Sequence, residues 1–400
     1  MKTLLMLGAS IDQLPAYREA IGRGYRLIAV DQRADAPGVA LAARFLPIST
    51  RDTDAIAAAL AGETIDGIVT TASDAGLASQ RELAIRYRLP SPTPDEAVRA
   101  SMDKTYFRQA VARAGLPTYP YVSDMDRVQL VEEAKQMPLP LVVKPADGSG
   151  GKGISLVTGY DQLDDAIDHA CELSAAELAT VEHYVEGRHY AVEIWLRNGE
   201  PHFVPITEKR MTPPPTMVTS GHLIPARLPS PEARKVRHAV VRMCAELGIT
   251  DGPANFDLVR TASGDMYLIE VGARLGGNAY PALMAAAWGV DTVGATISLA
   301  VGEPFDLTPQ RSRVCLLHIL SSPLAVPGVL REVTGLDEVR AHPGVQTVEL
   351  FVRPGDPVRP FTQAAYKLGF LTLVADDHEA LDGLLAWCTA TLRLHVEPST

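Results

Sequence analysis

The segment from 141 to 156, LVVKPADGSGGKGISL, sets four glycines between two short apolar runs, and it constrains the fold more than any other part of the sequence. Branched residues on either side favour strands at 140–144 and 154–157. The glycines allow a flexible loop between them, in which backbone N–H groups are free to surround an anion. Lys144 stands at the loop entry and Lys152 near its tip. The segment predicts a phosphate-binding hairpin, with a mobile hairpin in solvent as the alternative.

Two common phosphate motifs fit this segment poorly. Gly148, Gly150 and Gly153 have the GxGxxG spacing of a dinucleotide fingerprint. That fingerprint needs a helix after its last glycine, whereas 154–157 favours a strand. A Walker loop would need glycine in place of Ala146 and Ser or Thr in place of Gly153. An NAD-dependent oxidoreductase therefore rests on the glycine spacing alone.

Two carboxylates form the second signal. The turn Ser263-Gly264-Asp265 separates two strand-like runs, which predicts a hairpin. With Thr261 facing Met266, counting four residues outward on each strand places Asp257 opposite Glu270. Opposed residues have Cβ atoms about 4.5–5.5 Å apart, and like charges so placed repel. A cation between them removes the repulsion, which predicts a magnesium site; the alternative is that one side chain turns to solvent.

Two basic residues are further candidates for binding an anion. Lys104 lies in the first turn of a helix predicted at 101–114, where its charge opposes the helix dipole. A bound anion would explain that position, and a solvated lysine is the alternative. Arg274 follows Glu270 by four residues and is placed to clamp an anion. The isolated histidines His189 and His222 are each expected to be structural.

A chain of 400 residues exceeds the usual size of one hydrophobic core, so two or three domains are expected. Over the first ninety residues, strands alternate with helices, a pattern typical of a parallel sheet covered by helices. The expected elements are strands at 3–7, 26–30 and 67–71, and helices at 14–22, 53–61 and 76–87. Three prolines in Pro90-Ser-Pro-Thr-Pro-Asp95 indicate a boundary, which gives an N-terminal domain at 1–92.

The rest of the chain is predicted as an α+β domain at 93–310 and a smaller α+β unit at 311–400. Residues 120–190, which contain the glycine-rich loop, would form a lobe of the first. The segment 211–230 lacks periodicity and is rich in Pro, Thr and Ser, so a long surface loop is expected there, acting as a lid or specificity element. The smaller unit has strand candidates at 314–320, 345–351 and 369–375, followed by a terminal helix.

Charge and cysteine usage narrow the setting. The formal net charge of −11 argues against nucleic acid as a partner, although a local phosphate pocket stays open. The four cysteines form no CxxC pair, which fits a reducing cytoplasm. The apolar stretch 282–301 is interrupted by Asp291 and by glycines, so no membrane span is expected.

Taken together, the motifs resemble the ATP-grasp superfamily. The similarity rests on Met102-Asp-Lys-Thr105, the Val143–Gly153 loop, the segment Val181–Gly187, the hairpin from Asp257 to Glu270, and Arg274, in the order typical of that family. The resemblance implies a mixed α/β and α+β chain. Its parts would be an N-terminal Rossmann-like parallel-sheet domain, a two-lobed ATP-grasp domain and a small C-terminal α+β unit.

The resemblance also implies roles for individual residues. Lys104 and Lys144 would hold the α and β phosphates of ATP, and Asp257 and Glu270 would hold Mg²⁺, with Mn²⁺ as an alternative ion. Arg274 and Lys152 would serve the reaction itself. The remaining nucleotide-binding residues would be Gly148, Ser149, Gly150, Gly151 and Gly153 over the phosphates, Glu182, Tyr184 and Val185 beside adenine, and His189 at the ribose. The sequence departs from the family at His189, where many members have Glu, and at Gly272, where many have Asn.

The family chemistry is the activation of a carboxylate as an acylphosphate, which an amine then displaces. Two segments are most similar to the L-amino-acid and dipeptide ligases of the family. They are 270–277, EVGARLGG, and the stretch from Glu208-Lys-Arg210 to 221–225, GHLIP. The expected partners are small-molecule carboxylates and amines, without nucleic acid or membrane, and a homodimer stays open. The alternatives are a purine-pathway ATP-grasp synthetase or carboxylase, a non-catalytic nucleotide-binding regulator, and an NAD-dependent oxidoreductase.

Overall fold

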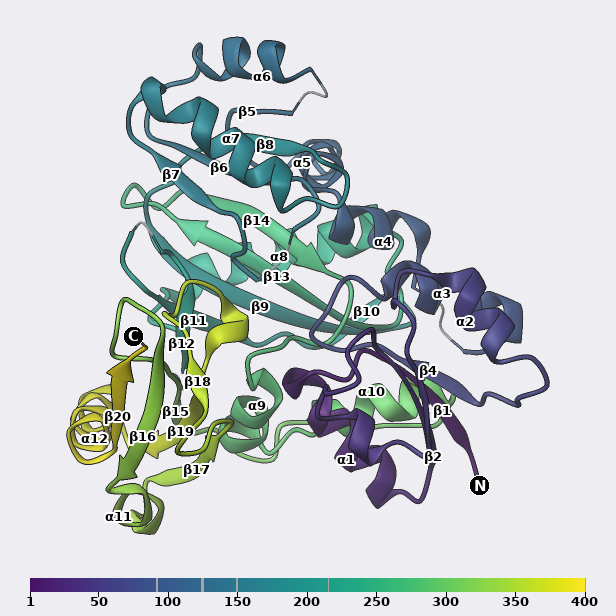
Figure 1. The fold of residues 1–400 in the computed structure, drawn as a ribbon. Coiled ribbons are helices and arrows are strands. Elements are labelled where there is room, and N and C mark those ends of the chain that lie inside the picture. The colour runs from purple at the N-terminus through teal and green to yellow at the C-terminus, as the bar shows by residue number, and fades with distance from the viewer. Residues whose placement is uncertain (91–92, 124–125, 149, 215, 400) are drawn as a thin grey trace.

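The computed structural model describes residues 1–90, 93–123, 126–148, 150–214 and 216–399. Figure 1 shows an N-terminal region, an upper lobe, a large central sheet and a C-terminal region. The helices of the first two parts are α1 (Leu14–Gly22), α2 (Thr53–Ala59), α3 (Leu77–Tyr87), α4 (Asp95–Met102), α5 (Lys104–Arg113), α6 (Arg127–Ala134) and α7 (Leu163–Glu172). The later helices are α8 (Ser230–Glu246), α9 (Tyr280–Trp288), α10 (Thr292–Ala300), α11 (Leu336–Ala341) and α12 (His378–Thr391).

The N-terminal region forms the expected parallel sheet. Its strands are β1 (Thr3–Leu7), β2 (Arg26–Val30), β3 (Arg44–Leu46) and β4 (Gly67–Val69), in the order β3-β2-β1-β4. Leu4 to Leu7 are buried, as parallel strands covered on both faces require. The sequence did not predict β3, which is only three residues long. From the later part of the chain, α10 packs on this sheet through Ile297.

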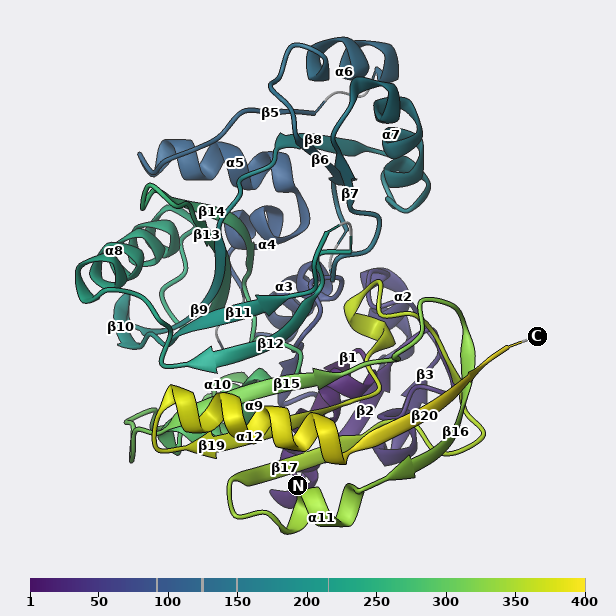
Figure 2. The ribbon, with the colours of Figure 1, turned by 90° about the vertical axis from the view of Figure 1, so that its left-hand side faces the viewer.

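The upper lobe carries the glycine-rich loop. Its strands are β5 (Tyr121–Val122), β6 (Leu141–Pro145), β7 (Ser155–Val157) and β8 (Ala179–His183), in the order β5-β8-β6-β7, all antiparallel. Helices α6 and α7 bury Leu130, Leu163 and Ile167 against Leu141 and Val181. The lobe therefore has its own apolar core, and it projects from the rest of the molecule in Figures 1 and 2.

A large antiparallel sheet joins the remaining parts. Its order is β14-β13-β9-β11-β12-β15-β19-β17, with β10 paired to β9. The strands are β9 (Arg188–Arg197), β10 (Glu200–Phe203), β11 (Ile206–Met211), β12 (Thr219–Ile224), β13 (Gly252–Arg260), β14 (Met266–Gly272), β15 (Val314–Leu320), β17 (Val345–Leu350) and β19 (Gly369–Ala375). Because β12 pairs with β15, strands of the region 311–400 continue the sheet of the preceding region (Figure 2).

The prediction of one long surface loop at 211–230 is wrong over 219–224, because β12 lies there in the middle of the large sheet; the described residues of 212–218 and 225–229 form no helix or strand. Gly221 makes the pairing with β15 possible, since a Cβ there would lie 2.4 Å from the carbonyl oxygen of Leu317. Residues 219–224 have no strong alternation of their own. The neighbouring strands decide their conformation, which sequence patterns do not report.

The helix expected at 101–114 is broken into two. Asp103 ends α4 with an extended backbone and caps α5, because its side chain accepts a hydrogen bond from Tyr106 N. The cap satisfies an N–H group that the start of a helix leaves open. Lys104 is therefore the first residue of α5.

The end of the chain adds a small sheet that the sequence did not predict. It contains β16 (Gly328–Thr334), β18 (Pro357–Val358) and β20 (Arg393–Pro398), in the order β18-β16-β20. The predicted terminal helix is α12, and it buries Leu381 and Cys388 against the large sheet. Within the described residues no single helix is long and apolar enough to cross a membrane; α9 and α10 meet that criterion only as a pair bent by 115°.

Candidate active site

The glycine-rich loop connects two antiparallel strands, as the sequence predicts. Strand β6 pairs with β7 from Leu141–Val157 to Val143–Ser155, and no helix follows the last glycine. Gly150, Gly151 and Gly153 all have positive φ, between 70° and 81°. A strand in place of the helix removes the N-terminus that would hold a pyrophosphate, so the dinucleotide fingerprint is excluded.

Two contacts fix the position of the loop. Lys104, at the start of α5, donates from Nζ to the carbonyl oxygen of Gly148. From the far end of the chain, Ala364 N donates to the carbonyl oxygen of Gly150 over 3.2 Å. The loop thus touches both α5 and the C-terminal region, and it closes over the space between them.

Lys144 lies in a buried network with Glu182. Lys144 Nζ is 2.7 Å from Glu182 Oε2, which also accepts a hydrogen bond from Tyr119 OH over 2.9 Å. Burial lowers the pKa of Lys144, although Glu182 opposes that shift. Burial acts to raise the pKa of Glu182, but Lys144 and Arg108 outweigh it and the pKa is lowered. The ion pair favours the charged form of each group, and it holds Lys144 at the wall of the cavity.

Asp257 lies directly opposite Glu270, as the sequence predicts. The pairing nearer the turn differs from the predicted one, however. Arg260, not Thr261, faces Met266, and one extra residue, Ile269, is inserted between the pairs Leu258–Leu268 and Asp257–Glu270. This insertion is a β-bulge. The predicted pairing of Thr261 with Met266 is wrong because the turn holds one more residue, and the bulge restores the register of the two acids.

The two acids share a strongly charged setting. Lys209, from β11, forms an ion pair with Asp257 Oδ2. Burial raises the pKa of Asp257 and Glu270 adds to that shift, while Lys209 opposes it. Burial also acts to raise the pKa of Glu270, but Lys104, Lys209 and other cations outweigh it, so its pKa is lowered. Glu270 is therefore the more readily ionised member of the pair.

Arg274 turns toward the N-terminal region and pairs with Asp74, with 2.9 Å between Nη2 and Oδ2. This ion pair fills the space beside Gly272, where a Cβ would lie 2.7 Å from Arg274 Cζ and 2.8 Å from Asp74 Oδ1. An asparagine at this position would displace the pair. Asn255 lies across the ladder from Gly272, two residues before Asp257, so the two side chains share one face of β13.

The buried carboxyl group of Glu193 binds the loop that follows β14. Glu193 on β9 accepts hydrogen bonds from Trp195 Nε1 over 2.9 Å and from Gly276 N over 3.0 Å. Burial raises the pKa of Glu193 to about 7. Glu193 thereby anchors the segment that carries Arg274.

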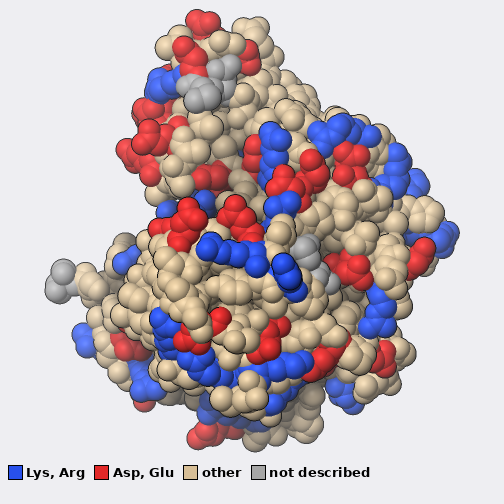
Figure 3. Space-filling view, turned by 90° about the vertical axis from the view of Figure 1, so that its right-hand side faces the viewer, with Lys and Arg blue, Asp and Glu red and all other residues tan. Residues whose placement is uncertain are grey.

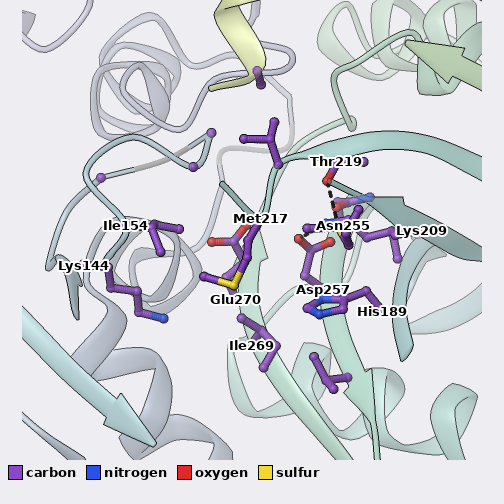
Figure 4. Close-up of a pocket in the computed structure, with 18 of the residues that line it drawn as sticks. Lys144, Ile154, His189, Lys209, Met217, Thr219, Asn255, Asp257, Ile269 and Glu270 are labelled. Atoms are coloured by element: carbon purple, nitrogen blue, oxygen red, sulfur yellow. Dashed lines mark hydrogen bonds and ion pairs between the residues drawn. The ribbon is translucent and has the colours of Figure 1, made fainter. Parts of the chain in front are cut away.

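The structure brings almost all of the predicted site residues to one cavity of about 310 Å³. Its walls include Lys104, Lys144, Gly148, Gly150, Gly151, Lys152, Glu182, Tyr184, Val185, His189, Asp257, Glu270 and Arg274. Gly153 shapes the loop without lining the cavity, and Ser149 lies outside the described residues. Figure 4 shows Lys144 on one side and Asp257, Glu270 and His189 on the other.

Several residues of this site were missed in the sequence. Lys209, Asn255 and Tyr280 line the cavity, and Asp74 and Arg108 support it. Lys209 and Asn255 are visible in Figure 4 beside Asp257. For Asn255 a signal existed, because residues two apart on a strand share a face. For Asp74 and Arg108 none did, since their partners lie 200 and about 160 residues away in the chain.

The histidines of this region are held neutral. Burial lowers the pKa of His222 to about 3, with a contribution from Lys209, and its Nδ1 lies 3.0 Å from Thr207 Oγ1. Burial likewise lowers the pKa of His189 to about 4. His222 packs edge to face with Tyr280, with 5.2 Å between the ring centres. Both histidines line the cavity, and the contacts of His222 with Thr207 and Tyr280 are in keeping with the predicted structural role.

Among the described residues, no group of three or more His, Cys, Asp or Glu side chains is placed to hold a metal ion. A cation at Asp257 and Glu270 would therefore take its other ligands from amide oxygens, water or phosphate oxygens. Asn255 offers such an oxygen on the same face. Carboxylate and amide oxygens are suitable ligands for Mg²⁺, so the donor set fits the ion.

On the face shown in Figure 3, Lys and Arg lie beside Asp and Glu over most of the surface, and a row of Lys and Arg runs across its lower part. Lys104, Lys144, Lys209 and Arg274 line the cavity itself.

Comparisons with known proteins agree with this geometry. Residues 137–282 match the model of the ATP-grasp domain, and 323–397 match that of the L-amino acid ligase C-terminal domain 2. The chain is 31% identical to uncharacterized protein y4rH of Sinorhizobium fredii over 335 residues, which is 82% of this chain and 68% of that protein.

Two ligases are more distant relatives. The L-arginine-specific L-amino acid ligase of Bacillus subtilis is 20% identical over 298 residues, 74% of this chain and 72% of that enzyme. The crystal structure of the L-amino acid ligase from Bacillus licheniformis superposes with a TM-score of 0.84 at 21% identity, covering 100% of this chain and 99% of that one. With the matched domains and the arrangement of the cavity, these findings show that the chain belongs to the ATP-grasp family of carboxylate–amine ligases.

Proposed function

We propose that this protein is an ATP-dependent ligase that joins a carboxylate to an amine, with amino acids as substrates. The observation that carries the proposal is the cavity itself, in which Lys104, Lys144 and the glycine-rich loop face the opposed acids Asp257 and Glu270. Cations at one wall and paired acids at another match a triphosphate bound together with a divalent cation. The match of residues 323–397 to an L-amino acid ligase domain supports amino acids as the substrate class.

Each part of the cavity has a proposed task. Lys104 and Lys144 neutralise phosphate oxygens, while Gly148, Gly150 and Gly151 offer backbone N–H groups to the phosphates. Tyr184 and Val185, in the connection between the upper lobe and the large sheet, line the space for adenine. His189 would contact the ribose. Ser149 and Gly153 would complete the loop that folds over the phosphates.

Asp257, Glu270 and Asn255 would hold Mg²⁺, with Mn²⁺ as an alternative. A bound divalent cation neutralises charge on the phosphate oxygens during transfer. Lys209 pairs with Asp257 and lines the same cavity. The release of Lys209 from Asp257 would supply one more cation to the transferred group.

The reaction proceeds in two steps. A carboxylate oxygen of the donor attacks the γ phosphorus of ATP, ADP leaves, and an acylphosphate forms. The amine of the acceptor then attacks the acyl carbon, phosphate leaves with the C–O bond electrons, and the nitrogen loses a proton to give the amide. Arg274 and Lys152 would stabilise negative charge in these steps, because each lines the cavity. The closed loop would exclude water, which would otherwise hydrolyse the acylphosphate.

The setting follows from the same proposal. Its partners are small molecules, and the chain acts as a monomer or homodimer. The free cysteines Cys171, Cys244, Cys315 and Cys388 fit a reducing compartment such as the cytoplasm.

Phosphate release in the presence of ATP and Mg²⁺ tests the function. Pools of amino acids should release phosphate only with certain pairs, and mass spectrometry of the product should show the sum of donor and acceptor less one water. Release with bicarbonate or an aminoimidazole nucleotide, and with no amino acid, would favour the purine-pathway alternative. Tight ATP binding without turnover would favour a regulator.

A further inference from the structure

A single buried arginine contacts the bulge in β14. Arg108, on α5, has a side chain with no exposed surface. Its two terminal nitrogens donate to consecutive carbonyl oxygens, Nη1 to Leu268 and Nη2 to Ile269. In a regular strand, consecutive carbonyl groups point in opposite directions. Here the carbonyl groups of Leu268 and Ile269 can both accept from one guanidinium, because the bulge at Ile269 interrupts the alternating direction of the carbonyl groups.

The bulge decides which way Glu270 points. Below it, Leu258 pairs with Leu268 and both side chains are buried in the core. Without an extra residue, that register would place Glu270 opposite Phe256, which also points into this core. A one-residue slip moves every side chain to the other face. With the bulge, Ile269 and Glu270 both line the cavity, although they are neighbours in sequence.

Arg108 also reaches the lysine network. Its Nε lies 3.7 Å from Glu182 Oε1, and Glu182 in turn binds Lys144. The guanidinium is packed between aromatic rings, 4.9 Å from the centre of Phe107 and 4.7 Å from that of Tyr119. These rings fix its plane, so the fork is preorganised for two acceptors. Strand β14 is at the edge of the large sheet, where buried carbonyl groups need a partner outside the ladder.

We propose that Arg108 is a positioning residue that maintains the β14 bulge and so directs Glu270 into the cavity, while Glu182 connects it to Lys144. The inference rests on the proposed role of Asp257 and Glu270 as ligands of a divalent cation. Arg108 does not contact the reacting groups. It acts on cation binding through the backbone of Leu268 and Ile269.

The test compares Arg108→Lys and Arg108→Gln with two matched controls. Lysine keeps the charge near Glu182 without the planar fork, and glutamine offers donors without the charge. Tyr119→Phe removes another partner of Glu182 and leaves the fork intact. Arg113→Lys alters an arginine of the same helix that pairs with Glu246 near the surface. Far-UV circular dichroism and thermal melts establish that each variant is folded.

Two measurements report on the bulge and do not require catalytic turnover. Mn²⁺ binding in the presence of a non-hydrolysable ATP analogue is measured from the free Mn²⁺ signal in electron paramagnetic resonance. Hydrogen–deuterium exchange is followed in the peptide 266–272. Both Arg108 variants should weaken Mn²⁺ binding about 10- to 100-fold, the range typical of residues that orient a metal ligand, and should speed exchange in that peptide. Arg113→Lys should stay within about twofold of wild type in Mn²⁺ affinity, and Tyr119→Phe, which alters the Lys144 network but not the fork, should leave exchange in the peptide at the wild-type rate.

Folded Arg108 variants with wild-type Mn²⁺ affinity and wild-type exchange would overturn the inference. So would failure of both variants to fold, because Arg108 would then serve the stability of the whole region. If the wild-type protein itself binds no Mn²⁺ with the analogue, the proposed cation site fails. The exchange comparison still reports in that case whether Arg108 maintains the bulge.

Discussion

Asp257 and Glu270 face each other across the hairpin of β13 and β14, and Lys209 from β11 forms an ion pair with Asp257. The like charges of the acids are thus balanced by a lysine from a different hairpin. On the proposed function, a divalent cation would take the place of this lysine as the counterion of the carboxylates. The predictions below follow from this balance and from the loop opposite it.

Glu270→Gln should abolish turnover while ATP binding remains measurable. The amide keeps the size of the side chain but removes the charge that would hold a divalent cation, whereas Lys104 and Lys144 still face the phosphates. Phosphate release measures turnover, and the affinity for an ATP analogue measures nucleotide binding; both are measured on the same preparation. Near-normal turnover would show that Glu270 has no role in cation binding.

Asn255→Ala should weaken divalent-cation binding by about tenfold or more, because it removes the neutral oxygen beside Asp257. Asn198→Ala, in an exposed turn, is the control, and its cation affinity should match that of wild type. The measurement is the Mg²⁺ dependence of ATP-analogue binding. Equal Mg²⁺ dependence in Asn255→Ala and wild type would remove Asn255 from the proposed ligand set.

Gly153→Ala should weaken ATP binding, and Gly199→Ala should not. Both glycines have positive φ, 72° and 79°, so each alanine costs about 1–2 kcal/mol of backbone strain. Only at Gly153 would the new Cβ also meet a neighbour, 2.8 Å from Pro145 Cγ, while Gly199 has open space around it. Urea unfolding should therefore show a lower free energy of unfolding in both variants. ATP titration should show a lower affinity in Gly153→Ala alone. Unchanged ATP affinity in Gly153→Ala would argue against a precise loop conformation.

Stability should fall as the pH drops from 7 to 5, in part through His222. Its pKa in the folded chain is about 3, below the ordinary value of about 6.5, so the unfolded chain takes up a proton in this window and the folded chain does not. The stability from a neutral His222 is present above the unfolded pKa and declines below it. The loss by pH 5 is about 2 kcal/mol.

Replacing His222 by Gln should reduce the loss of stability between pH 7 and pH 5 by about 2 kcal/mol. The exposed His238→Gln on α8 is the control and should keep the wild-type slope. Urea unfolding at pH 7 and pH 5 supplies the comparison. An unchanged slope in His222→Gln would show that His222 is protonated in the folded protein.

Local sequence determined much of this site. The glycines at 148–153 lie between β-branched runs, and the turn at 263–265 separates two strands, so both hairpins could be predicted from short stretches of the chain. Counting along one hairpin also predicted the opposition of Asp257 and Glu270, but the count agrees with the structure only because the bulge at Ile269 compensates for a turn that is one residue longer. In each case the interacting residues lie within about fifteen positions, where backbone geometry limits the outcomes.

Only the tertiary structure decided the rest. Arg108 from α5 contacts the bulge at Ile269, Lys209 reaches Asp257 from another strand, and β12 is a strand because β11 and β15 flank it. These contacts join segments that are far apart in the chain. The sequence therefore determined which residues could bind phosphate and cation, and packing between distant segments determined their direction, because a side chain's facing depends on the register imposed by its neighbours.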